Sequence, residues 1–289
     1  MWLERCNKNK LLKEISTFGI GGPARWFLEV NTVELLQEAI CQADQAKIPY
    51  LIVGKGSNTL FDDRGFNGLV LLNKISFMQE EENLIHVSSG YSFSLLGAQT
   101  AKKGWSGLEF ASGIPATVGG AVYMNAGAGG HETCDHLLRV TYMTTTGDMV
   151  TYNKEELQFS YRFSSFQTMK GAIVIATFEL LRNQEARNQQ LAMIDYRTRT
   201  QPYGDKSAGC VFRNPKAASA GALIEQCGLK GLKVGDAEVS TLHANFIVNK
   251  GCATARDVLE LARLVQNKVH EATGVELEME IRCQPYENT

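Results

Sequence analysis

The 289-residue sequence has no long run of large apolar residues, no excess of one charge and no cysteine pair at CxxC spacing. Its longest uncharged run, residues 110–130, is rich in glycine and contains Pro115, which argues against a membrane-spanning helix. The N-terminal residues lack the apolar core of a signal peptide. Lys plus Arg total 29 and Asp plus Glu total 31, which gives no basic footprint for nucleic acid. We therefore expect a soluble, cytoplasmic protein with neither a membrane nor a nucleic acid as partner.

The sequence also lacks a metal-binding pattern. Seven scattered cysteines, an odd number, fit reduced thiols better than a disulfide framework. The segment HETCDH at residues 131–136 fails the HExxH zinc motif, because Asp135 stands where the second histidine is required. An exposed turn is the better interpretation of this segment, and we expect no metal site.

Strand and helix patterns alternate irregularly along the chain, which predicts an α+β fold, and the length allows two domains. Polar residues 182–190 have the composition of a surface helix joining the domains. Thr254 and Asp257 are placed to cap a helix that Gly274 ends. Apolar and charged residues then alternate over 275–283, which predicts a last strand. Earlier strands are predicted at residues 24–30, 50–53, 84–88, 138–144 and 173–180.

Glycine is concentrated in residues 104–130, which hold eight of the chain's 27 glycines and one charged side chain, Glu109. Such density indicates either tight turns or a backbone that approaches a ligand closely, and composition alone does not decide between them. GKGSN at residues 54–58 follows a strand, as a phosphate-binding loop does, but Thr59 occupies the third glycine position of the dinucleotide fingerprint. The P-loop motif is also absent. A nucleotide ligand therefore stays open, without either of the common nucleotide-binding folds.

Three side chains are candidates for catalysis, although each also has an ordinary structural interpretation. Arg162 lies in a segment rich in aromatic residues and hydroxyls, where a surface arginine is common. Cys210 follows a glycine and precedes Val–Phe, which suits a buried thiol. Glu280 is one of three carboxylates on one face of the predicted last strand, which is typical of a solvated face. Taken singly, none of them justifies a catalytic role.

Taken together and in order, the motifs resemble the UDP-N-acetylenolpyruvoylglucosamine reductase family (MurB), flavin enzymes of bacterial peptidoglycan synthesis. The matches span nearly the whole chain in the family's order. The short length is similar to that of the subtype without an inserted segment and its substrate-covering tyrosine. The matching segments are TFGIGGPA (17–24), VGKGSNTLF (53–61), GLEFASGIPATVGGAVYMNAGA (107–128), SYRFSSF (160–166), AGCVFRNP (208–215), AGALIEQCGLKG (220–231), STLHANFIVN (240–249) and GVELEMEIR (274–282).

This resemblance implies an FAD-binding region of the vanillyl-alcohol-oxidase (PCMH) type over residues 1–182, made of two α/β subdomains. A smaller C-terminal α/β substrate domain would cover residues 183–289, and its last strand would return to the flavin site. The FAD, held without a covalent bond, would have its diphosphate on two loops whose small residues let amide groups reach phosphate oxygens. The residues expected to bind FAD are Gly54, Lys55, Gly56, Ser57, Asn58, Thr59, Leu60, Ser112, Gly113, Ile114, Pro115, Thr117, Gly119 and Gly120.

Within the second loop the chain departs from the family at one position. Ala116 stands where the family commonly has glycine. We expect this change to be tolerated unless the residue takes a positive φ.

The family's reaction passes a hydride from NADPH to the flavin, and then to the enolpyruvyl double bond of UDP-N-acetylglucosamine enolpyruvate, giving UDP-N-acetylmuramate. Arg162 matches the family's arginine and would hold the substrate carboxylate. Glu280 matches the catalytic glutamate, and burial should raise its pKa if it acts as a proton-bearing donor. Cys210 stands where the family has a serine proton donor, and a thiol, with a reference pKa of about 8.5, is a competent acid.

The resemblance also implies a site for the UDP-sugar. Arg213 and Asn214 match positions that contact it, and Arg197 and Arg199 are weaker candidates for its diphosphate. No obligatory protein partner is evident. Two alternatives stay open: a sugar or aldonolactone oxidase of the same fold, which would not need the catalytic set, and a nucleotide-sugar-binding protein that has lost redox chemistry. A preparation that cannot be reconstituted with FAD would favour the second alternative.

Overall fold

The computed structural model describes residues 2–216 and 218–287, and the chain divides into two compact units. Unit 1 comprises Met1–Cys6, Phe27–Gly54 and Gly68–Arg197, and unit 2 comprises Asn7–Trp26, Lys55–Asn67 and Thr198–Thr289. A single boundary after residue 182 therefore does not describe the compact units, because two N-terminal segments belong with the C-terminal part. Each unit has an apolar core of its own.

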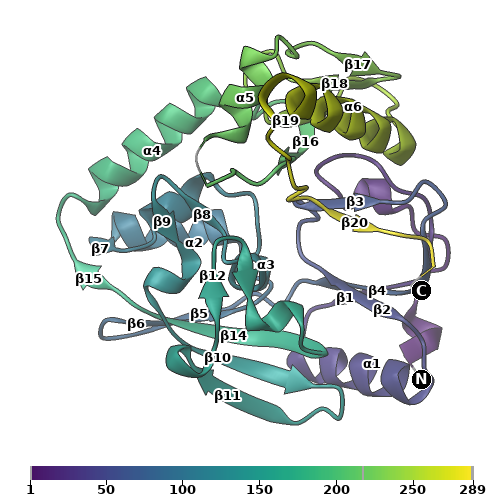
Figure 1. Cartoon of the computed structure of the whole chain (residues 1–289). Coiled ribbons are helices and arrows are strands. Elements are labelled where there is room, and N and C mark those ends of the chain that lie inside the picture. Colours follow the sequence, from purple (N-terminus) through teal and green to yellow (C-terminus); the bar gives the residue numbers. More distant parts are fainter. Residues whose placement is uncertain (1, 217, 288–289) are drawn as a thin grey trace. The chain divides into compact units, whose positions relative to one another are not determined.

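Unit 1 is built on an antiparallel five-stranded sheet in the order β11-β10-β14-β6-β5 (Figure 1). Helices α2 (Phe93–Lys102) and α3 (Val118–Met124) contribute Leu96 and Val122 to the same core as Val140 of the sheet. The glycine-rich segment, which includes α3, thus packs against the same apolar core as the sheet. The strands are β5 (Met78–Glu81), β6 (Leu84–Ser88), β10 (Leu137–Thr144), β11 (Met149–Asn153) and β14 (Gly171–Glu179).

A smaller sheet in the order β1-β4-β2 carries the chain between the units, because β1 (Ala24–Val30) and β4 (Phe66–Asn73) each begin in unit 2 and end in unit 1. β2 (Tyr50–Val53) runs parallel to β4, and the loop expected to bind phosphate begins directly after β2. Helix α1 (Val33–Gln45) lies between β1 and β2 in sequence. The Thr32 side chain caps its N-terminus by accepting a hydrogen bond from the Leu35 amide.

Short elements complete unit 1 and the N-terminal region. In the described part of the chain, no helix is both long enough and apolar enough to cross a membrane. The paired short strands are β7 (Trp105–Ser106) with β15 (Leu181–Arg182), β8 (Gly127–Ala128) with β9 (His131–Glu132), and β12 (Phe159–Ser160) with β13 (Phe163–Ser164). The remaining helices are α4 (Ala186–Thr200) and the 3-10 helices Trp2–Arg5, Leu12–Glu14, Glu109–Gly113, Thr133–Asp135, Lys154–Glu156 and Ser165–Gln167.

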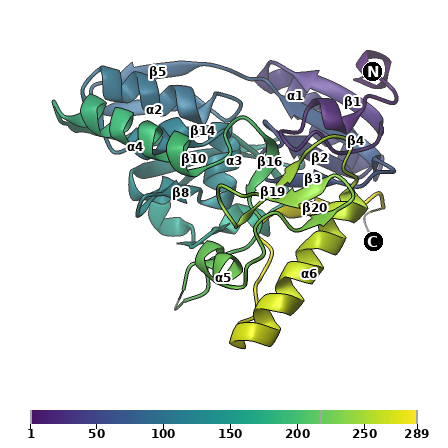
Figure 2. The same ribbon diagram turned by 90° about the horizontal axis from the view of Figure 1, so that it is seen from above.

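Unit 2 contains an antiparallel four-stranded sheet in the order β16-β19-β18-β17, together with helices α5 (Ala220–Gln226) and α6 (Ala255–Thr273). Both helices bury apolar faces in the core that the sheet shares, and Figure 2 shows the full length of α6. Beside this sheet, β3 (Thr59–Phe61) pairs in parallel with β20 (Arg282–Gln284). The sheet strands are β16 (Lys206–Cys210), β17 (Lys233–Val234), β18 (Ala237–Val239) and β19 (Phe246–Asn249).

The strand predicted over 275–283 is too long: regular strand is confined to β20, with one isolated bridge between Met279 and Phe212. Leu277 and Ile281 are buried and Glu276 and Glu278 are exposed, as the alternation predicts. The ladder is interrupted because the segment changes partner. It bonds first to residues 211–213 and then to Asn58 and β3.

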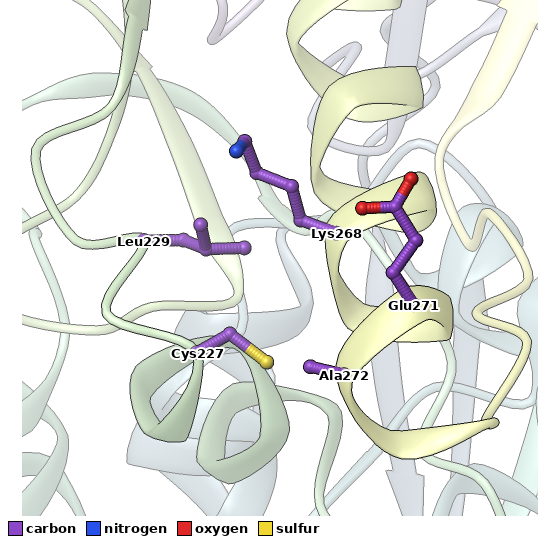
Figure 3. A pocket seen from close by; sticks show the side chains of 5 residues that line it. All are labelled: Cys227, Leu229, Lys268, Glu271 and Ala272. Carbon is purple, nitrogen blue, oxygen red and sulfur yellow. The ribbon is translucent and has the colours of Figure 1, made fainter.

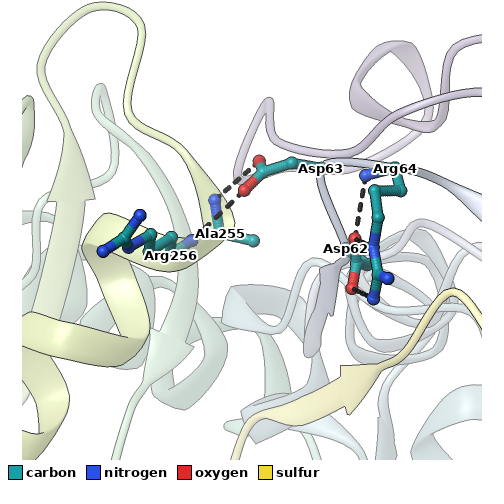
Figure 4. A network of polar contacts seen from close by, with 5 residues as sticks. All are labelled: Asp62, Asp63, Arg64, Ala255 and Arg256. Carbon is teal, nitrogen blue, oxygen red and sulfur yellow. Dashed lines mark hydrogen bonds and ion pairs between the residues drawn. The ribbon is translucent and has the colours of Figure 1, made fainter.

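Helix α6 begins with all its first amide groups hydrogen-bonded. Thr254 and Asp257 form the predicted capping box. In addition, the Asp63 carboxylate accepts hydrogen bonds from the amides of Ala255 at 2.8 Å and Arg256 at 3.3 Å (Figure 4). A carboxylate at this end also interacts favourably with the helix dipole. Asp63 therefore ties the loop after β3 to α6 within unit 2.

Replacing Asp63 should lower the stability of the protein. We expect Asp63→Ala to cost about 1–2 kcal/mol in unfolding free energy, since both hydrogen bonds and the charge are lost. Asp63→Asn keeps an acceptor and should cost about half as much. Asp205→Ala is the matched control, because it removes only an exposed ion pair with Lys250. Urea denaturation measures all three, and an Asp63→Ala midpoint equal to that of Asp205→Ala would contradict the capping role.

Candidate functional site

The loop after β2 has the geometry of an anion-binding turn. Gly56 is buried and has φ +58°, and a Cβ there would meet the Ile15 carbonyl oxygen at 2.8 Å and Ser16 Cα at 3.0 Å. Within the described chain, no protein acceptor takes a hydrogen bond from the amides of Gly56, Ser57 or Asn58. Successive unbonded amides around a left-handed residue form a concavity that suits phosphate oxygens. Only glycine fits at position 56.

The next two residues are held differently. Thr59 and Leu60 belong to β3, which pairs with β20, and the Leu60 side chain is 1% exposed in the core of unit 2. The buried Leu60 side chain is therefore not available to a cofactor, whereas the Thr59 side chain is half-buried and remains accessible. Lys55 is exposed. Their roles in FAD binding stay predictions.

The second glycine-rich loop is packed tightly within unit 1. A Cβ on Gly54 would lie 2.3 Å from Thr117 Oγ1, and one on Gly119 would lie 2.7 Å from Ser89 Cβ. Gly54 and Thr117, one from each expected loop, are therefore in direct contact. Ala116 is not among the non-glycine residues with positive φ, so it fits the backbone without strain.

Most amides of this second loop already donate to acceptors within the protein, so close packing accounts for its glycines better than phosphate binding does. The amides of Val118 and Gly119 donate to the carbonyls of Tyr91 and Ser89, and that of Gly120 donates to Thr117 Oγ1. The amides of Ile114 and Ala116 also have backbone acceptors. These groups are not available to a phosphate as they stand. The glycines here permit close packing, while the first loop offers unbonded amides.

One polar atom of the second loop does lack a partner. Ser112 Oγ is buried with no hydrogen-bond partner among the described residues. A buried hydroxyl in that state is costly, and a bound polar ligand would satisfy it. Gly113 and Ile114 complete this turn, and Pro115 is exposed. Each loop by itself therefore fits a part of FAD: the open amides of Gly56–Asn58 in unit 2 suit phosphate oxygens, and the buried hydroxyl of Ser112 in unit 1 suits a polar group.

Arg162 occupies a strained turn. It lies at the tip of the β12–β13 hairpin with φ +59°, a position that glycine or asparagine normally takes. Its guanidinium carbon lies 4.8 Å from the centre of the Tyr161 ring, and Nη2 donates to the Gly127 carbonyl at 3.4 Å. A non-glycine residue held in this conformation costs on the order of 1–3 kcal/mol, and such strain is concentrated at functional sites.

Two amide side chains hold the hairpin around Arg162, of which Asn125 is buried and Gln167 is half-buried. Gln167 Nε2 donates to the carbonyls of Arg162 and Tyr123, both at 3.0 Å. Asn125, itself left-handed at the end of α3, donates to the Ser160 carbonyl at 3.0 Å. Sequence reasoning assigned no role to either residue. An asparagine at a helix end followed by Ala–Gly is, however, a recognisable signal for a left-handed cap.

In unit 2, the segments of Cys210 and Glu280 are joined by hydrogen bonds. The Glu280 amide donates to the Val211 carbonyl at 2.7 Å, and the Arg213 amide donates to the Glu278 carbonyl at 2.9 Å. Cys210 and Glu280 are both half-buried. Asn58 joins the same network, because its Nδ2 donates to the Glu280 carbonyl at 3.3 Å. Hydrogen bonds thus join the loop that is expected to bind phosphate to the segments of two predicted catalytic residues.

The two predicted substrate-binding residues, Arg213 and Asn214, lie in the same segment, shortly after Cys210 in sequence. Arg213 is half-buried, and its Nε is buried with no hydrogen-bond partner within the described chain. An arginine nitrogen left in that state suits an anionic ligand. Asn214 is exposed and its Oδ1 accepts from the Ala220 amide at 3.0 Å, so part of its side chain anchors the start of α5. Substrate contacts of both residues stay predictions.

One surface pocket of the described residues is lined by none of the predicted site residues. Figure 3 shows a surface pocket of unit 2 between the end of α5 and α6, lined by Cys227, Leu229, Lys268, Glu271 and Ala272. Among the residues described, no group of three or more His, Cys, Asp or Glu is arranged to hold a metal ion.

Comparisons with known proteins agree with this architecture. Residues 24–153 match the model of an FAD binding domain, and residues 201–284 match that of the UDP-N-acetylenolpyruvoylglucosamine reductase C-terminal domain. The UDP-N-acetylenolpyruvoylglucosamine reductase of Protochlamydia amoebophila is 59% identical over 96% of this chain and 94% of its own. That of Chlamydia muridarum is 49% identical over 96% of this chain and 93% of its own.

A solved structure shares the fold. The crystal structure of UDP-N-acetylenolpyruvylglucosamine reductase (MurB) from Thermus caldophilus has a TM-score of 0.84 and 40% identity, and covers 97% of this chain and 99% of its own. The fold is therefore α+β, with an FAD-binding domain and a C-terminal domain, as predicted. It defines an FAD-binding oxidoreductase. The chain belongs to the UDP-N-acetylenolpyruvoylglucosamine reductase (MurB) family of peptidoglycan synthesis.

Gly54→Ala should disturb the contact between the two loops. The added Cβ would overlap Thr117, so we expect a loss of about 1–3 kcal/mol in stability and a lower FAD content. Gly204→Ala is the control, since nothing lies within 4 Å of a Cβ there and its φ is not positive. Flavin absorbance per protein and the melting temperature report both effects. A Gly54→Ala protein that matches the control in both would contradict the packing argument.

Arg162 gives a second test. Arg162→Asn should be more stable than Arg162→Ala by on the order of 1 kcal/mol, because asparagine tolerates the left-handed conformation and alanine does not. Neither variant retains the guanidinium that is predicted to bind the substrate carboxylate, so we expect both to lose reductase activity. Thermal unfolding of the two variants gives the comparison. Equal stabilities would show that the hairpin relaxes and stores no strain at this position.

Proposed function

We propose that this protein uses NADPH to reduce UDP-N-acetylglucosamine enolpyruvate to UDP-N-acetylmuramate. The observation that carries the proposal is the hydrogen-bonded frame of unit 2, in which Glu280, the Cys210 segment and the loop at Asn58 are joined. Family membership supports it, because relatives that are 59% and 49% identical are named for a reductase of this substrate. The unbonded amides of Gly56–Asn58 fit FAD as the cofactor.

Bound FAD would supply hydride transfer, from NADPH to the double bond of the enolpyruvyl group. The protein's own groups have to manage the charge and the proton. Hydride arriving at the β-carbon builds negative charge on the α-carbon and its carboxylate, and preorganised donors stabilise such charge. Arg162 would bind this carboxylate, because its planar, permanently charged guanidinium matches a carboxylate with two parallel donors. The left-handed backbone conformation at Arg162 would set the direction in which its side chain leaves the hairpin.

The α-carbon then requires a proton, which Cys210 would supply. The S–H bond breaks, its proton goes to the α-carbon, and the resulting thiolate regains a proton from water before the next turnover. Glu280, half-buried beside this segment, would donate a hydrogen bond to the developing charge. Arg213 would bind the diphosphate of the UDP-sugar, which satisfies its buried Nε, and Asn214 would contact the sugar.

An anaerobic assay in two stages tests the function as a whole. NADPH should first bleach the flavin absorbance, and UDP-N-acetylglucosamine enolpyruvate should then restore it without oxygen. A flavin that NADPH bleaches but this substrate does not reoxidise would favour an oxidase of the same fold. A protein that cannot be loaded with FAD would favour a nucleotide-sugar-binding protein without redox chemistry.

Cys210→Ala tests the proton donor. We expect bleaching by NADPH within about two-fold of wild type, and reoxidation by substrate slowed by roughly 10²–10⁴-fold, the usual range for losing a general acid. Cys210→Ser should restore part of the rate, and Cys252→Ala, an exposed thiol, serves as the control. Reoxidation at the wild-type rate in Cys210→Ala would eliminate Cys210 as the donor.

A further inference from the structure

A buried asparagine clamps the segment that follows Cys210. Asn245 is 3% exposed, and it precedes β19. Its Oδ1 accepts from the Phe212 amide at 2.9 Å, and its Nδ2 donates to the Phe212 carbonyl at 2.8 Å. Its own carbonyl accepts from the Val211 amide at 2.8 Å. Three hydrogen bonds thus hold the two residues between Cys210 and Arg213.

This clamp replaces a sheet ladder. The pairing of β16 with β19 is irregular between Ser207 and Cys210, where Gly209 takes φ +80°. Beyond Cys210 the strand has ended, and Phe212 would otherwise have a buried amide and carbonyl to satisfy. Like a backbone peptide group, the Asn245 side-chain amide presents a carbonyl oxygen that accepts and an N–H that donates. It therefore continues the pairing where the backbone of β19 cannot.

The clamped segment is also bonded on its other side. The Val211 carbonyl accepts from the Glu280 amide at 2.7 Å. The Asn58 carbonyl in turn accepts from the Arg282 amide at 2.9 Å. Val211 is bonded to Glu280 and is the chain neighbour of Cys210. A shift of residues 211–212 would therefore change the position of the Cys210 thiol relative to Glu280.

We propose that Asn245 is a positioning residue for the protonation step, and that it sets the Cys210 thiol and Arg213 against Glu280. The role of Cys210 in this inference rests on the proposed function. Asn245 acts only through the backbone that it bonds, since its side chain is buried and both its polar atoms bond to Phe212. Misplacement of a reacting group by about 1 Å can slow a reaction by on the order of 10²-fold.

Asn245→Asp is the primary variant. It keeps the size and the acceptor for the Phe212 amide, but it loses the donor and places an oxygen against the Phe212 carbonyl. In the FAD-loaded enzyme we expect reoxidation by substrate to slow by roughly 10–100-fold, with bleaching by NADPH within about two-fold of wild type. Asn245→Ser, which removes both side-chain bonds to Phe212 but buries no charge, keeps the test possible if the aspartate variant does not fold.

Asn249→Asp is the matched control. Asn249 is 6% exposed and lies at the end of β19. Its Nδ2 donates to the Phe18 carbonyl at 3.2 Å, and its Oδ1 accepts from the amides of Gly251 and Ala253, both at 3.0 Å. The same substitution there removes the same kind of bond without touching residues 210–213. It should lower the melting temperature similarly but leave reoxidation within about three-fold of wild type.

A double-mutant cycle separates positioning from general damage. If Asn245 acts through Cys210, adding Asn245→Asp to Cys210→Ala should slow reoxidation by less than three-fold further, because residues that act as a unit are not additive. Fully additive losses would overturn the proposal, as would equal reoxidation rates in the Asn245 and Asn249 variants.

The alkylation rate of Cys210, followed by peptide mass spectrometry, gives a readout that needs no turnover. It should change in Asn245→Asp and not in Asn249→Asp, and an unchanged rate in both would overturn the positioning role. Normal turnover by Cys210→Ala would overturn the donor assignment alone, and the alkylation rates would then decide the role of Asn245.

Discussion

The hydrogen bond from the Glu280 amide to the Val211 carbonyl, 2.7 Å long, is the contact on which the candidate site of unit 2 depends. It joins a C-terminal segment to the segment after β16. Through Asn58 the same network reaches the loop with the unbonded amides. Chain segments more than 200 residues apart in sequence are thereby held in one frame. A shift of the backbone at any of these bonds therefore affects both the loop that is expected to bind FAD and the candidate catalytic residues.

The glycines of the two loops have different structural roles, although the two loops are similar in composition. In the first, Gly56 turns the chain and leaves three amides open to an anion. In the second, the amides of Val118 and Gly119 are bonded internally, and the missing side chains allow helix α3 to pack against its neighbours. Close packing of this kind fixes the position of Thr117 against Gly54.

Much of the fold follows from local pattern, and most of the site does not. The predicted strands 24–30, 50–53 and 84–88 match β1, β2 and β6, because short runs rich in β-branched and aromatic residues are typical of strands. The strand over 275–283 was overextended, since a pattern of alternation cannot reveal a change of pairing partner. The compact units also could not be predicted, because segments 7–26 and 55–67 join unit 2 through long-range contacts. Asn245 and Gln167 were missed for the same reason: their partners are backbone atoms of distant residues or of an irregular turn.

Residue-level hydrogen exchange, with and without FAD, tests the central claim that the open amides of unit 2 form the diphosphate cradle. We expect FAD to protect the amides of Gly56, Ser57 and Asn58 by at least ten-fold. We expect little change at Val118 and Gly119, which are already bonded, and slow exchange of the Glu280 amide in both states. Unchanged exchange at Gly56–Asn58 on FAD binding would contradict the role of these amides as the diphosphate site, and fast exchange of the Glu280 amide in the loaded protein would contradict the hydrogen-bonded frame.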